Sequence, residues 1–184
     1  MAYTTINDPT DYFNTVLYTG NNNARTITGL DFQPDLIWGK GRSEASDHTA
    51  TDSVRGNTKV LTPNNSTSEG TTSTYVTSFN SNGFSLGNDN GMNKNNVTYA
   101  AWNWKETATA GFDIVSYTGN GSNRTISHSL SAVPKWIIVK KRNGEDNWNV
   151  YHEAMGNTHF MSLNENSAKE DSAARWNDTT PTRS

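Results

Sequence analysis

The segment FNTVLYTG at residues 13–20 returns as FDIVSYTG at residues 112–119, and this recurrence governs how the rest of the sequence is read. RTIT at 25–28 returns as RTIS at 124–127, again 99 residues later. After one inserted residue the spacing becomes 100, so that GNT at 56–58 matches GNT at 156–158. A nearly constant spacing of this kind indicates an internal duplication, in which each copy is one structural unit.

Each copy has the sequence pattern of β-structure. Short runs rich in β-branched and aromatic residues occupy 12–18, 35–40, 74–79 and 97–104. Turn-forming residues lie between such runs, as in NG at 82–83 and GNGS at 119–122. Roughly seven or eight strands per copy predict an all-β fold of tandem antiparallel β-sandwich repeats, jelly-roll-like and about 100 residues each.

The duplication also predicts the domain organisation. We expect an N-terminal arm at 1–11, a first repeat at 12–105, a linker at 106–111 and a truncated second repeat at 112–184. The second copy reaches Ser184 before any counterpart of GFSLG at 83–87 or VTYAAWNW at 97–104. Because a shortened sheet exposes an unpaired edge, we expect the remaining strands to come from a longer chain or from a neighbouring subunit.

The composition excludes several classes of protein. The 184 residues include 25 Asn, 25 Thr and 18 Ser, types that favour turns and strands over helix interiors, so a helical bundle is excluded. The 6 Trp, 7 Tyr and 6 Phe disfavour a disordered chain. A net charge of −3 disfavours nucleic-acid binding. No apolar run is long enough to cross a membrane, and residues 1–9 lack the features of a cleaved leader.

No constellation of catalytic or metal-binding residues is recognisable in the sequence. There is no cysteine, and the four histidines, His48, His128, His152 and His159, do not have the spacing of a metal site. GNDNG at 87–91 departs from the order of a calcium loop and is predicted to be a hairpin turn. We therefore predict a protein that is not an enzyme and has no cofactor, with a glycan hydrolase as the least favoured alternative.

The aromatic residues fall into two groups. The first lies within the strand runs, largely recurs between the copies and is predicted to pack in the core: Phe13, Tyr18, Trp38, Phe112, Tyr117 and Trp136. The second lies near strand ends or loops: Trp104, Trp148, Tyr151 and Trp176. Residues of the second group either cap the ends of the sandwich or stack on sugar rings, and they are the candidate glycan-binding residues.

Several segments resemble an uncharacterised repeat domain in structural proteins of marine tailed bacteriophages. They include TGLDFQPDLIWGKGRS at 28–43, DSVRGNTKVL at 52–61 and TYAAWNWK at 98–105 in the first copy. In the second copy the longest is VPKWIIVKKRNGEDNWNVYHEAMGNT at 133–158. The resemblance covers most of the chain in matching order.

The resemblance implies a virion structural protein of the tail-fibre, tail-associated or head-decorating type, with no catalytic residues. It would assemble in the host cytoplasm, attach to the particle through its N-terminal part and contact other virion proteins. We also expect a homo-oligomer, a trimer if the protein forms a fibre, and contact with host surface glycans. The alternative is a carbohydrate-binding module that recognises those glycans.

Overall fold

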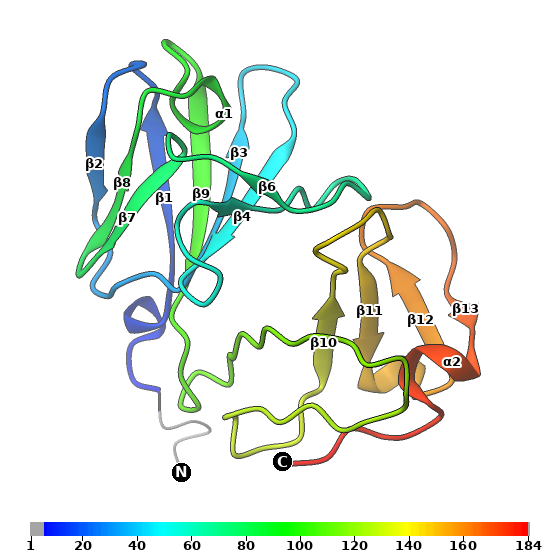
Figure 1. Ribbon diagram of the computed structural model, residues 1–184. Coiled ribbons are helices and arrows are strands. Elements are labelled where there is room, and N and C mark those ends of the chain that lie inside the picture. The colour runs from blue at the N-terminus through cyan, green and yellow to red at the C-terminus, as the bar shows by residue number, and fades with distance from the viewer. Residues whose placement is uncertain (1–5, 184) are drawn as a thin grey trace.

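The computed structural model describes residues 6–183, which form antiparallel sheets joined by loops and short helical turns (Figure 1). One sheet of the first half has the order β1-β9-β3-β4, from β1 (Phe13–Thr19), β9 (Thr98–Trp104), β3 (Leu36–Gly41) and β4 (His48–Asp52). Its second sheet has the order β2-β8-β7, from β2 (Arg25–Thr28), β8 (Gly83–Leu86) and β7 (Val76–Asn80). The predicted all-β class is confirmed, as are the strands expected near 12–18, 35–40, 74–79 and 97–104.

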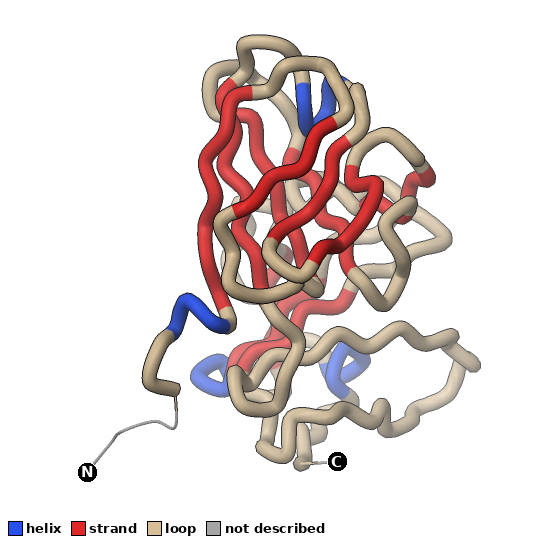
Figure 2. The backbone as a smooth tube through the Cα atoms, turned by 90° about the vertical axis from the view of Figure 1, so that its left-hand side faces the viewer, coloured by secondary structure: helices blue, strands red, loops and turns tan. Residues whose placement is uncertain are grey.

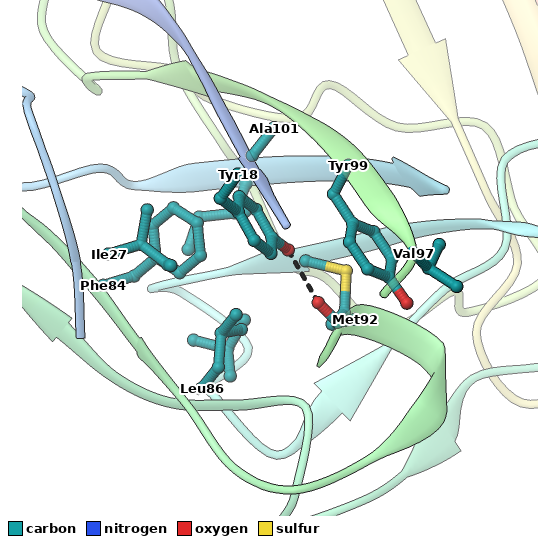
Figure 3. Packing of buried hydrophobic residues seen from close by; sticks show 10 residues of the cluster. Tyr18, Ile27, Phe84, Leu86, Met92, Val97, Tyr99 and Ala101 are labelled. Carbon is teal, nitrogen blue, oxygen red and sulfur yellow. Dashed lines mark hydrogen bonds between the residues drawn. The ribbon is translucent and has the colours of Figure 1, made fainter. Parts of the chain in front are cut away.

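The two sheets of the first half enclose one hydrophobic core. Because side chains alternate along a strand, every second residue faces inward. The core cluster comprises Tyr18, Ile27, Ile37, Val76, Phe84, Leu86, Met92, Val97, Tyr99 and Ala101. Figure 3 shows the ring of Tyr18 beside that of Tyr99, with centroids 5.1 Å apart, and the Tyr18 hydroxyl donating to the Met92 carbonyl at 2.7 Å. The buried hydroxyl is therefore satisfied. Because residues of both sheets form this one core, the first half is a β-sandwich.

The hairpin turn predicted at 87–91 is instead the start of a short helix, α1 (Asn90–Asn93). The Asp89 carboxylate accepts a hydrogen bond from the Gly91 amide at 2.8 Å and caps the helix. Asp and Asn favour helix N-caps as strongly as they favour turns, which explains the error. The cap places Asn93, a fully buried amide, so that its nitrogen donates to the carbonyls of Asn23 and Gly87, each at 2.7 Å.

The second half forms a single sheet instead of the predicted sandwich. The sheet contains β10 (Trp136–Val139), β11 (Asn149–His152), β12 (His159–Ser162) and β13 (Glu170–Asp171), with α2 (Ala173–Trp176) after it. Residues 112–135 contain no strand. In the first half β1 pairs with β9 and β2 pairs with β8, and the described part of the second half has no counterparts of β8 or β9. Residues 112–118 and 124–127, which match β1 and β2, therefore have no partner strand among the described residues.

The strands of the second half match β3 to β6 with the same pairing. Leu36 lies opposite Asp52, and Trp136 lies opposite His152. The short ribbon β5 (Lys59–Val60) and β6 (Gly70–Thr71) pairs Lys59 with Thr71, as β12 and β13 pair His159 with Asp171. The spacing is 100 residues at each of these positions, so the two halves share strand registers as well as sequence.

The remaining segments lie at the base of the molecule. Figure 2 shows the strands of the first half grouped together in red, with long loops in tan below them. Within the predicted arm, η1 (Pro9–Asp11) is a single helical turn capped by Asp8, while residues 1–5 lie outside the described part of the chain. The predicted linker at 106–111 is a tight turn, closed by a bridge between Thr107 and Phe112.

Two further short elements complete the second half. η2 (Glu153–Met155) follows β11 directly, and α2 ends at Asn177, whose backbone is left-handed with φ of 54°.

Candidate functional site

The four candidate glycan-binding residues do not form one surface. Trp148 and Tyr151 are buried, with exposed fractions of 8% and 3%, and offer no ring face to a ligand. The Trp176 ring meets Tyr151 edge-on, with centroids 5.7 Å apart, and its Nε1 donates to the His159 carbonyl at 3.0 Å. Of the two alternatives for these residues, stacking on sugar rings is contradicted for Trp148 and Tyr151, because both side chains are buried.

The predicted core group is also divided. Tyr18 is in the core, but Tyr117, its match in the second half, is 46% exposed and Trp136 is 61% exposed. Phe13 is exposed as well, since it occupies an outward position of β1. Periodicity identifies two faces of a strand without showing which of them another layer covers.

Trp104 belongs instead to an aromatic face on the outside of the first sheet. We use this name for Phe13, Trp38, Trp104 and Phe112. The Trp104 ring lies 4.9 Å from that of Phe13, 6.5 Å from that of Trp38 and 6.2 Å from that of Phe112, centroid to centroid. Register brings three of these rings together, since Phe13 of β1 lies opposite Trp104, and Trp38 of β3 lies opposite Trp102, which is on the same face of β9 as Trp104.

His48 orients one edge of the aromatic face. The Trp38 indole Nε1 donates to His48 Nδ1 at 2.9 Å. Burial lowers the pKa of His48, and the positive charge of Lys40 lowers it further, so the ring keeps the lone pair that accepts this bond. The result is a fixed group of flat apolar rings, of the kind that packs on the apolar face of a sugar or on another protein.

The second structured feature is an ion cluster between the two halves, which we call the junction cluster: Asp52, Arg55, Glu69 and Arg142. Arg55 Nε donates to Asp52 at 2.5 Å, and its Nη1 donates to Glu69 at 3.0 Å. Arg142, from the second half, binds both oxygens of Glu69, at 2.8 and 3.0 Å. Two parallel bonds of this kind fix the orientation of the Arg142 guanidinium relative to the Glu69 carboxylate as well as the distance between them.

Glu69 of the junction cluster is held in its ionised form. Burial acts to raise the pKa of Glu69, but the hydrogen bonds and charges of Arg142 and Arg55 outweigh it and hold that pKa below its usual value. The side chains of Arg55 and Glu69 are only 6% and 11% exposed. Sequence reasoning missed this cluster, because Glu69 and Arg142 are 73 positions apart and Glu69 is matched by Lys169 in the second copy.

Trp148 completes the contact between the halves. Its Nε1 donates to the carbonyls of Thr62 and Asn65, at 3.2 and 3.1 Å. Two backbone bonds lie beside it, from the Glu69 amide to the Arg142 carbonyl at 2.8 Å and from the Asp146 amide to the Ser66 carbonyl at 3.0 Å. One of the four candidate glycan-binding residues is therefore part of an internal interface.

A pair of carboxyls marks the turn between the halves. Burial raises the pKa of Glu106 to about 7, and a hydrogen bond with Asp113 adds to the effect. For Asp113, burial acts to raise the pKa, but hydrogen bonds from Ser129 and from Glu106 outweigh it and lower that pKa. Glu106 therefore keeps its proton to a higher pH than an unperturbed glutamate, and Asp113 ionises before it. Within residues 6–183, no group of three or more His, Asp or Glu side chains is arranged to hold a metal ion.

A family described as "Domain of unknown function (DUF7483)" matches residues 8–184. The chain belongs to the DUF7483 family. The matched range of the DUF7483 domain includes both halves, and so the junction cluster lies inside the domain. No curated protein and no solved structure is significantly similar to the chain. Among the described residues, the helices of this DUF7483 domain are too short and too polar to cross a membrane.

Proposed function

We propose that the chain is a structural component of a tailed-bacteriophage particle, of the tail-fibre, tail-associated or head-decorating type. It acts by binding, without catalysis. The resemblance along residues 28–43, 52–61, 98–105 and 133–158 supports this function. In this role it contacts other virion proteins, forms a homo-oligomer, trimeric in a fibre, and resides in the virion after assembly in the host cytoplasm.

The contact between the two halves, made by an ion cluster, an indole and backbone bonds, is the observation that carries the proposal. A protein displayed on a particle must hold its outer module in a fixed orientation. The junction cluster, the Trp148 indole and two backbone hydrogen bonds do this with groups that are largely buried. The many Asn, Thr and Ser residues keep the surface of a displayed protein well hydrated.

The N-terminal arm is the proposed attachment segment, and a short deletion tests it. Removing residues 1–7 leaves Asp8, whose carboxylate accepts from the Thr10 amide at 2.9 Å, so the first helical turn keeps its cap. We expect the deleted protein to remain folded, as measured by circular dichroism, but to be lost from assembled particles. Incorporation equal to that of the full chain would refute the attachment role.

A second candidate function is carbohydrate binding, and the aromatic face favours it. Phe13 is 39% exposed, and its ring lies against Trp104, which is partly exposed. Flat rings on a rigid sheet stack on sugars with little loss of conformational entropy. The site for a host surface glycan would therefore be the outer face of the first sheet.

A glycan array separates this candidate from a purely structural role. We expect Phe13→Ala and Trp104→Ala to weaken glycan binding, whereas Trp136→Ala, which removes an exposed tryptophan elsewhere, leaves it unchanged. Phe13→Ala protects the test against misfolding, because the ring is on the surface. An array on which the unmodified chain binds no host polysaccharide would contradict carbohydrate binding.

A further inference from the structure

An open cavity lies in the first half, beside the ribbon formed by β5 and β6. Its volume is about 400 Å³, which falls within the range of about 300–1,000 Å³ that is usual for small-molecule sites. Thr and Ser side chains make up most of its wall, and Val60, Tyr75 and Asp89 complete it. The cavity shares no residue with the aromatic face or with the junction cluster.

Asp89 supplies the charge in the wall of the cavity. Its Oδ1 accepts a hydrogen bond from the Gly91 amide at 2.8 Å, and its Oδ2 accepts one from the Thr74 hydroxyl at 2.9 Å. An ionised carboxylate has about four lone-pair sites, so two further hydrogen bonds can be accepted. Asp89 is therefore held in place by the protein and can still bind the hydroxyl groups of a ligand.

Tyr75 supplies a ring and a hydroxyl to the same wall. A Cβ atom added at position 91 would overlap the Tyr75 ring, so the glycine there lets the ring pack directly on the backbone. Within residues 6–183 the Tyr75 hydroxyl has no hydrogen-bond partner. Burial raises the pKa of Tyr75, and the charges of Asp89 and Asp47 raise it further, so the hydroxyl keeps its proton and can donate it to a ligand.

The second half repeats the ribbon but not the cavity. The strands β12 and β13 pair as β5 and β6 do. At the spacing of 100 residues, Val60 and Tyr75 are matched by the larger Phe160 and by Arg175. There the Arg175 guanidinium lies 4.8 Å from the centre of the Phe160 ring. The matched side chains contact each other, so the shared framework alone does not produce the cavity.

The groups in the wall favour a neutral ligand that carries several hydroxyls. No Lys, Arg or His among residues 6–183 lines the cavity, and the Asp89 carboxylate repels an anion. A calcium ion takes six to eight oxygen ligands from several carboxylates and carbonyls, whereas Asp89 is the one carboxylate of the described wall. A sugar has hydroxyls for the polar groups and an apolar face for Val60 and the Tyr75 ring.

We propose that this cavity binds one neutral sugar residue, whose hydroxyls bond to Asp89 and Tyr75 and whose apolar face packs on Val60. The proposal rests on the carbohydrate-binding function for the source of the sugar, a host surface glycan. It places that glycan at a site other than the aromatic face, and either site can bind without the other.

A titration with simple sugars tests the proposal directly. Methyl glycosides of glucose, galactose, mannose and N-acetylglucosamine are added to the isotope-labelled full chain, and the chemical shifts of its backbone amides are followed by NMR spectroscopy. We expect at least one of these sugars to give saturable shift changes at residues 67–72, at Tyr75 and at Asp89.

Three variants of the protein complete the test. Asp89→Asn keeps a side chain that also caps helices but removes the charge, and it should weaken sugar binding at least about tenfold. Tyr75→Phe keeps the ring and should weaken binding about threefold. Asp31→Asn is the matched control, because it makes the same change at an exposed carboxylate outside the cavity, and its affinity should equal that of the unmodified chain.

The absence of saturable shift changes with all four sugars would overturn the proposal, and so would unchanged affinity in folded Asp89→Asn and Tyr75→Phe. Shift changes confined to Phe13, Trp38, Trp104 and Phe112 would support carbohydrate binding at the aromatic face and overturn this site. Saturable changes at the cavity with calcium chloride but with no sugar would identify a cation as the ligand and would also overturn it.

Discussion

Glu69→Gln is expected to loosen the two halves of the molecule with a large loss of stability. The substitution keeps the size of the side chain but removes its charge. Glu69 accepts one bond from Arg55, whose side chain is 6% exposed, and two from Arg142, whose side chain is 38% exposed. After the change, part of the positive charge of Arg55 and Arg142 has no partner at a largely buried position.

The magnitude follows from those exposures. A buried charge-assisted hydrogen bond contributes about 1.5–3 kcal/mol, which applies to the bond from Arg55. The pair with Arg142 is partly solvated and contributes about 1 kcal/mol or less. Arg55 keeps its bonds to Asp52 and to the Ala50 carbonyl, so the loss is smaller than for an isolated buried charge. We expect the free energy of unfolding to fall by about 2–4 kcal/mol.

Urea denaturation at pH 7 measures this loss, with Glu153→Gln as the control. Glu153 pairs with Lys135 at 2.9 Å, but their side chains are 48% and 72% exposed, so that change should cost about 0.5 kcal/mol or less. A double-mutant cycle with Arg142→Gln isolates the pairwise energy. If Glu69→Gln costs no more than Glu153→Gln, or if the cycle shows no coupling, the role given to the junction cluster is refuted.

The pH dependence of the same variant has a definite sign. Because the folded-state pKa of Glu69 lies below its unfolded value, its contribution is present above about pH 4.5 and is lost as pH falls through the folded-state pKa. The unmodified chain should therefore lose more stability than Glu69→Gln on acidification from pH 7 to pH 3. Equal losses of stability in the two proteins between pH 7 and pH 3 would contradict the lowered pKa of Glu69.

Three further substitutions have outcomes that follow from single contacts. Asn93→Ala removes two donated bonds, one to the buried Gly87 carbonyl and one to the partly buried Asn23 carbonyl. Thermal unfolding should show a loss of about 2–4 kcal/mol, and an unchanged melting temperature would contradict the role of this amide. Trp148→Phe keeps an aromatic ring but removes two donated hydrogen bonds. Urea denaturation should show that the free energy of unfolding falls by about 1–2 kcal/mol. An unchanged free energy would mean that the indole nitrogen contributes nothing to stability. For Glu106 the folded-state pKa of about 7 exceeds the unfolded value of 4.5, so its stabilising contribution is present below pH 4.5 and is lost as pH rises through 7. Melting temperatures at pH 5 and pH 8 should therefore differ less in Glu106→Gln than in the unmodified chain, and an equal difference would refute the raised pKa of Glu106.

The strands of the first half were predictable because short runs of β-branched and aromatic residues alternate there with turn-forming residues. Val97–Trp104 combines β-branched, small and aromatic residues in a run of strand length, and turn-forming residues precede it. The helix α1 was not predictable, because Asp89 caps a helix with the same side-chain bond that it would use in a turn. The local sequence therefore predicts the position of a strand better than it predicts whether the connection between two strands is a turn or a short helix.

The burial of aromatic residues was poorly predicted, since it depends on partners distant in sequence. Tyr18 and Tyr117 occupy matched positions, yet only Tyr18 has a strand such as β9 beside it. Trp148 looked like a residue at a strand end, and it is buried because residues 62–65 of the other half cover it. Of the candidate site, the sequence therefore identified Trp104 but neither its ring neighbours nor the ion cluster.

The contact between the halves is also asymmetric, because the two halves contribute residues of opposite charge to it. Glu69 of the first half meets Arg142 of the second, and their matched residues are Lys169 and Arg42. If the order of the halves were exchanged, two positive side chains would meet where an acid and a base now pair, and at such short distances like charges repel. The charge pattern therefore makes the two units non-interchangeable and fixes which end of one faces which end of the other.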